Sequence, residues 1–79
     1  MEDKQQLQVI FGEVLHTARM EKKLKQAELA EICGMDDTYI SDLERGKYMP
    51  SLFTVLKLSK GLGLSLSELG SRIDEFVRY

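Results

Sequence analysis

The sequence has little of several residue types that mark particular classes of protein. Its only cysteine, Cys33, excludes an internal disulfide, and with one histidine, His16, no cluster of Cys and His suggests a metal site. No apolar run approaches the ~20 residues that span a bilayer, and the first residues lack the basic start and apolar segment of a secretory signal. We therefore expect a cytoplasmic protein with no metal, no cofactor and no membrane association.

The remaining composition is that of a small globular chain. The 79 residues are 43% hydrophobic and 30% charged, and a chain of this length folds as one domain near the lower limit of independent stability. Such a domain leaves little room for a deep catalytic cleft or for a separate small-molecule domain. His16 has no Cys or Ser partner in a motif. We expect a binding module, not an enzyme.

Apolar periodicity predicts five helices and no strands, and so an all-α, compact five-helix bundle that occupies residues 1–79 as a single domain. The expected helices cover about 4–22, 26–33, 37–45 and 52–61, with the last running from about 66 almost to the C-terminus. Their expected inward-facing residues are Leu7, Phe11, Leu15 and Ala18, then Leu29, Ala30 and Cys33, then Ile40 and Leu43, and then Leu52, Val55, Leu56 and Ser59.

Capping residues mark where these helices begin and end. Gly34 is expected to end the second helix, Asp36 to cap the third, and "SLSE" from Ser65 to Glu68 to form a capping box for the fifth. The connection "GMD" between the second and third helices is only about three residues long. Two short helices joined so tightly, with a glycine in the turn, are typical of a helix-turn-helix.

The ordered stretch "LKQAELAEICGMDDTYISDLERGKYMPSL" resembles the Xre-type helix-turn-helix family of phage-repressor-like regulators. In that family a Gln opens the second helix, "LA" follows, and "IS.LERG…PS" spans the third helix and its exit. The resemblance covers about residues 11–69 and is greatest to the small members that include restriction–modification controller proteins. It implies a lambda-repressor-like fold and a transcriptional regulator that binds an inverted-repeat operator in double-stranded DNA as a homodimer.

The resemblance also implies roles for individual residues. It implies a structural ion pair between Arg19 and Glu44, which would tie the first helix to the end of the third. Contacts to DNA phosphates are expected from Lys25, Gln26, Tyr39, Arg45, Lys47 and Tyr48. The open alternative is that these are ordinary surface side chains. Where many relatives have a Ser or Thr cap this chain has Lys25, which weakens the cap by ~1 kcal/mol.

The expected base-reading residues of the third helix are Asp37, Thr38, Ser41 and Asp42. Many relatives have Arg or Gln at the position of Asp37, and the net charge of −2 is unusual for a DNA-binding domain. Asp37 could accept a hydrogen bond from cytosine or favour the positive end of the helix. Asp42 could reach the groove or pair with a cation on the same surface.

The last helix, within residues 65–79, supplies a candidate dimer interface at Leu69, Ile73, Phe76 and Val77, with Tyr79 as an aromatic end. The alternative for this apolar stripe is that it only covers the core. For the whole protein, the acidic third helix leaves a second function open. The chain could be a protein-interaction module of the same fold, of the antitoxin or anti-repressor type, with weak or no DNA binding.

Overall fold

The computed structural model describes residues 3–77, and within that range the chain forms five helices and no strand. The helices are α1 (Lys4–Glu21), α2 (Gln26–Cys33), α3 (Asp37–Glu44), α4 (Leu52–Gly61) and α5 (Leu66–Asp74). The predicted all-α fold is confirmed, and α1 to α4 match the expected bounds to within one residue. None of the helices described is both long enough and apolar enough to cross a bilayer.

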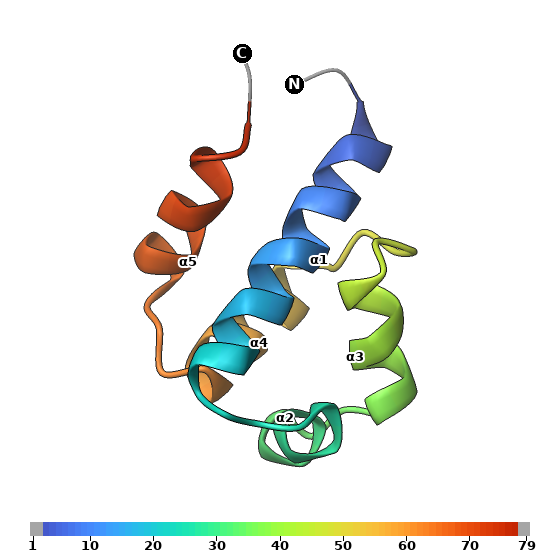
Figure 1. Ribbon diagram of the computed structural model, residues 1–79, viewed down its shortest axis with the longest axis vertical. Helices are drawn as coiled ribbons and strands as arrows, with labels where there is room; N and C mark the ends of the chain where they lie inside the picture. The colour runs from blue at the N-terminus through green and yellow to red at the C-terminus, as the bar shows by residue number, and fades with distance from the viewer. Residues whose placement is uncertain (1–2, 78–79) are drawn as a thin grey trace.

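The long helix α1 forms the centre of the bundle. Figure 1 shows α3 on one side of it and α5 on the other, with α2 across the end between them and α4 behind. α1 packs against α3 and α5, while α2 packs against α3 and α4. The pair α2 and α3 is therefore supported from behind by α1 and α4, which leaves the outer face of α3 free.

The turn between α2 and α3 has the geometry that its sequence predicts. Gly34 ends α2 with a φ of 68°, a left-handed conformation that a residue without a Cβ adopts at little cost. Asp36 then caps α3, because its Oδ1 accepts a hydrogen bond from the backbone N–H of Thr38 at 3.0 Å. The cap fixes the direction in which α3 leaves the turn.

A single hydrophobic core joins all five helices. It contains Phe11, Val14, Leu15, Ala18, Leu29, Ala30, Cys33, Ile40, Leu43, Leu58, Leu62 and Leu69, all of them buried. The predicted inward faces of α2 and α3 are confirmed, as are Phe11, Leu15 and Ala18 in α1. Leu7, near the start of α1, is only partly buried.

The predicted inward face of α4 is partly wrong. Leu52 and Leu56 are 67% and 36% exposed, whereas Leu58 and Leu62 are fully buried. The true inward stripe is shifted by three residues and keeps only Val55 and Ser59 of the four predicted residues. The helix is apolar on more than one side, so two helical registers were available and periodicity alone could not separate them.

The prediction for α5 needs two corrections. The helix ends at Asp74, so it does not continue to the C-terminus, although the capping box of Ser65 and Glu68 forms as expected. Leu69, predicted at a dimer interface, is 1% exposed and belongs to the core of the monomer. A side chain enclosed by its own chain offers no surface to a partner, so Leu69 takes the alternative role of core residue.

Candidate nucleic-acid interface

The outer face of α3 presents three of the four residues predicted to read bases. Asp37 and Thr38 are exposed and Ser41 is half-buried, while Ile40 and Leu43 point into the core and are fully buried. The spacing of Asp37, Thr38 and Ser41 places them on the same side of the helix. Short polar side chains on a helix held from behind can approach the edges of base pairs.

Asp42 does not belong to that exposed set. Its side chain is 13% exposed, and its Oδ1 accepts from Arg45 Nη2 at 2.5 Å and lies 3.7 Å from Lys47 Nζ. The hydrogen bond from Arg45 lowers the pKa of Asp42, and Lys47 acts in the same direction. The prediction of Asp42 as a base reader is therefore corrected: its carboxylate is engaged by two cations of its own chain.

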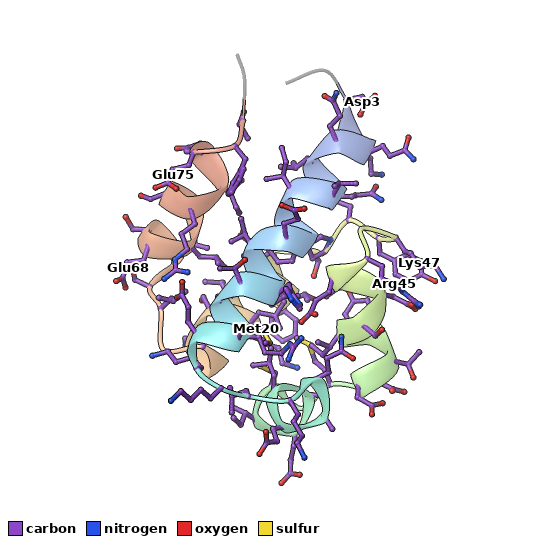
Figure 2. All side chains as sticks on the ribbon, in the orientation of Figure 1. Asp3, Met20, Arg45, Lys47, Glu68 and Glu75 are labelled. Carbon is purple, nitrogen blue, oxygen red and sulfur yellow. The ribbon has the colours of Figure 1, made fainter. Side chains whose placement is uncertain are left out.

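Arg45 and Lys47 form a cationic edge where the chain leaves α3. Their side chains are 61% and 54% exposed. Figure 2 shows them side by side at the C-terminal end of α3, on the far side of the molecule from Glu68 of α5 and Glu75 just beyond that helix. The rings of Tyr39 and Tyr48, with centroids 6.3 Å apart, pack beside this edge. Although the net charge of the chain is −2, the side of the molecule at the end of α3 therefore presents two exposed cations, Arg45 and Lys47.

The predicted pair of Arg19 and Glu44 joins α1 to the last residue of α3. Arg19 Nε donates to Glu44 Oε2 at 2.6 Å, and Arg19 Nη2 donates to Glu44 Oε1 at 3.0 Å, so the pairing is bidentate. The two side chains are only 8% and 6% exposed. A third guanidinium bond, from Arg19 Nη1 to the carbonyl of Leu24, fastens the loop before α2.

Two residues outside the predicted pair also bind Glu44. His16 Nδ1 lies 2.9 Å from Glu44 Oε1, and Gln26 Nε2 donates to the same oxygen at 3.2 Å. Burial raises the pKa of Glu44, but the hydrogen bonds from Arg19, His16 and Gln26 outweigh it, and the net pKa is lowered. One carboxylate from α3 therefore holds side chains from α1 and α2 in place.

Close backbone packing sets the position of that carboxylate. A Cβ added to Gly12 of α1 would lie 2.6 Å from the carbonyl oxygens of Leu43 and Glu44, so only glycine permits this approach. Gln8 Nε2 adds a hydrogen bond of 3.1 Å to the carbonyl of Gly46, just beyond α3. The end of α3 is thus fixed to α1 by both backbone contact and side-chain bonds.

The start of α2 differs from an ordinary capped helix. Lys25 at the N-cap accepts no hydrogen bond with its side chain, since an ammonium has no acceptor, but its backbone N–H donates to Glu28 Oε1 at 2.7 Å. The side chain of Lys25 is exposed and that of Gln26 is half-buried, turned toward Glu44. Lys25 is free to meet an anion, and Gln26 is oriented by its bond to Glu44.

The residues predicted for a dimer interface have different environments. Besides the buried Leu69, Ile73 packs partly buried against the core, Val77 is half-buried, and Phe76 is 51% exposed. Tyr79 lies outside the described residues. Among the described residues, the two most exposed large apolar side chains lie instead on α4, where Phe53 is 70% and Leu52 is 67% exposed, and Leu56 on the same helix is 36% exposed.

Comparison with known proteins decides the family. Residues 15–69 match the helix-turn-helix family, which covers more than half of the chain and both helices of the motif. The chain belongs to the helix-turn-helix family. This confirms the resemblance to Xre-type regulators.

Several control and controller proteins are similar over most of the chain. Control protein C.MunI of Mycoplasma sp is 41% identical over 70 residues, which cover 87% of this chain and 95% of that protein. The ImmF control region 10 kDa protein of Bacillus phage phi105 is 41% identical over 75% of this chain and 66% of its own length. The crystal structure of the restriction-modification controller protein C.AhdI from Aeromonas hydrophila has a TM-score of 0.76 and 39% identity, covering 78% of this chain and 94% of that one.

Two contacts of the buried Glu44 carboxylate were not predicted from the sequence. His16 had no predicted partner and Gln26 only a DNA phosphate, whereas both contact Glu44 of the same chain. His16 lies three residues before Arg19, one turn along α1, and that spacing was the available signal. Among residues 3–77 no three His, Cys, Asp or Glu side chains gather closely enough to hold a metal ion.

Proposed function

We propose that this DNA-binding transcriptional regulator acts as a homodimer that recognises an inverted repeat in double-stranded DNA. The observation that carries the proposal is the outer face of α3. Thr38, Ser41 and Asp37 lie there on a helix whose other side is sealed in the core. Exposed Lys25 lies at the start of α2, and Arg45 and Lys47 lie beyond the end of α3. This arrangement lets base contacts be made between flanking phosphate contacts.

The three aspartates near α3 then have three different roles. Asp36 caps the helix, and its carboxylate is engaged by the backbone N–H of Thr38. Asp37 lies exposed in the first turn, where its carboxylate interacts favourably with the positive end of the helix dipole and can accept a hydrogen bond from cytosine N4. Asp42 holds Arg45 and Lys47 in the free protein. Its negative charge competes with DNA phosphates for these two cations, which weakens binding to arbitrary sequences.

The proposed dimer forms through the outer face of α4. A single short recognition helix gives limited affinity, and proteins of this fold bind paired half-sites about one helical turn apart. Leu52, Phe53 and Leu56 form an exposed apolar surface on α4. The ammonium of Lys57 lies over the ring of Phe53, 5.2 Å from the ring centroid. Contiguous exposed apolar side chains commonly mark a contact with another protein. A second copy of the chain is the partner that the paired half-sites require.

The proposal is tested by replacing the two hydroxyl side chains on α3. Thr38→Ala combined with Ser41→Ala should change which duplex sequence is enriched from a random pool, because the hydroxyl groups that could contact base edges are lost. Lys25→Ala or Arg45→Ala should weaken binding to all sequences to a similar extent and reduce the salt dependence. An unchanged sequence preference in the Thr38 and Ser41 double variant would contradict the assignment of α3 as the reading helix.

A further inference from the structure

His16 is the exposed member of the cluster built on Glu44, and the proposed DNA contacts leave it without a role. Its side chain is 54% exposed, whereas Arg19 and Glu44 beneath it are almost completely buried. The ring extends from α1 next to Gln26, the first residue of α2, because both side chains reach the same carboxylate oxygen. His16 therefore lies beside the proposed phosphate contacts at the start of α2.

The contact with Glu44 fixes the protonation of one ring nitrogen. A carboxylate oxygen only accepts, so at 2.9 Å from Glu44 Oε1 the Nδ1 of His16 carries the hydrogen. Arg19 Nη2, 3.2 Å from the same nitrogen, is also a donor, and both donors share Glu44 Oε1. With Nδ1 held by Glu44, the second nitrogen, Nε2, is the one that can bind a proton from solvent.

The charges around His16 come from two helices. Glu13 and Arg19 lie on α1 and Glu44 lies on α3, while α2 contributes the uncharged amide of Gln26. Arg19 already neutralises the charge of Glu44. The uncharged ring of His16 therefore faces an ion pair with almost no net charge and the exposed carboxylate of Glu13. A DNA phosphate arriving there would add one negative charge next to a nitrogen that can become a positively charged N–H donor.

We propose that His16 is a further phosphate ligand, which binds the DNA backbone as an imidazolium through Nε2–H while Nδ1–H stays on Glu44. One proton passes from solvent to Nε2 as the complex forms, and no covalent bond between heavy atoms changes. The inference rests on the proposed DNA binding and adds a consequence: because binding takes up a proton, affinity for DNA rises as the pH falls.

The experiment measures proton uptake directly. The probe is a mixed-sequence duplex of about two helical turns at low salt, titrated calorimetrically near neutral pH in buffers of different ionisation enthalpy. For the wild-type protein we expect uptake of up to one proton per chain and an affinity that increases several-fold between about pH 8 and pH 6. His16→Gln keeps an amide that can donate to Glu44 but cannot titrate, and it should abolish both the uptake and the pH dependence.

The matched control is Glu13→Gln, which removes the other ionisable group that lines the same hollow with His16 and Glu44. It should retain the proton uptake of the wild-type protein, and thermal unfolding should show that both variants are folded. DNA binding without proton uptake, or uptake that persists in His16→Gln, would overturn the assignment of His16 as a phosphate ligand but not the proposed DNA-binding function. Absence of binding to any duplex would overturn the proposed function as well.

Discussion

At the scale of single residues, the side chain with the largest structural effect is Glu44. It accepts hydrogen bonds from Arg19 and Gln26 and contacts His16, and it does so almost without access to solvent. This carboxylate compensates the charge of Arg19, and the guanidinium also donates to the carbonyl of Leu24. Removal of one member of a buried ion pair leaves the other charge desolvated, which is far more costly than the loss of a surface pair.

We therefore predict that Glu44→Gln lowers the free energy of unfolding by about 3–5 kcal/mol at neutral pH. Because the pKa of Glu44 is lower in the folded chain than in the unfolded chain, the pair contributes stability above the unfolded pKa, and this contribution is lost as the pH falls through the folded pKa. Denaturant unfolding at several acidic pH values should show a shallower acid-induced loss of stability in Glu44→Gln than in the wild-type protein.

The control for this measurement is Glu13→Gln, an exposed carboxylate on the same face of α1 as His16. It should keep the neutral-pH stability and most of the acid dependence. Equal acid dependence in the wild type and in Glu44→Gln would show that the buried pair does not control the response to pH.

Asp42 gives a second prediction at this scale. Asp42→Asn removes the charge that engages Arg45 and Lys47, so binding to a mixed-sequence duplex at low salt should tighten, by roughly fivefold, with a steeper salt dependence. Asp37→Asn is the matched control, since it removes the same charge from the exposed first turn of the same helix. If Asp42 competes with DNA for the two cations, Asp42→Asn should tighten binding more than Asp37→Asn does. Equal tightening by the two variants would show that only the net charge of the protein matters.

At the scale of helices, what the sequence could predict depended on whether a signal was local. The caps at Gly34, Asp36 and Ser65 formed as expected, because each depends on neighbouring backbone groups. The inward face of α4 was wrong because the choice between Leu56 and Leu58 depends on where α2 and α5 pack, which lies outside the helix's own sequence.

The candidate site divides in the same way. The pairing of Arg19 with Glu44 could be anticipated from a family resemblance, and the exposure of Thr38 followed from the buried positions on α3. The contact of Gln26 with Glu44 had no local signal, since it joins residues 18 positions apart, and the contact of His16, 28 positions from Glu44, was signalled only by its spacing from Arg19. The burial of Leu69 likewise depends on how α5 lies against the rest of the bundle.

The start of α2 allows a test of one helix. Lys25→Ser supplies the side-chain acceptor that the cap lacks, so the free energy of unfolding should rise by about 1 kcal/mol while affinity for DNA falls through loss of a cation. Thermal unfolding and duplex binding measure the two changes separately. Lys25→Ala is the control: it should lose the same affinity without the gain in stability. A cap variant that gains no stability over Lys25→Ala would contradict this account of α2.

At the scale of the whole molecule, assembly determines whether two α3 helices can meet two half-sites. Phe53→Asp on α4 should weaken the dimer by introducing a charge into the proposed interface, and it should also weaken operator binding, because dimer formation is linked to DNA binding by mass action. Phe76→Asp, beyond the end of α5, is the matched control, since Phe53 and Phe76 are 70% and 51% exposed in the monomer. Sedimentation equilibrium would detect the loss of dimer, and dissociation caused by Phe76→Asp alone would move the interface to the C-terminal segment.

We propose that the face of α3 reads a paired DNA site despite its aspartates. Selection of bound duplexes from a random pool, first at low salt and then near physiological salt, tests this proposal. We predict enrichment of an inverted repeat whose half-sites lie about one helical turn apart, with the preferred sequence changed in the Thr38→Ala and Ser41→Ala double variant. A folded, dimeric protein that enriches no sequence would contradict the claim and would make the acidic face of α3 a surface for a protein partner.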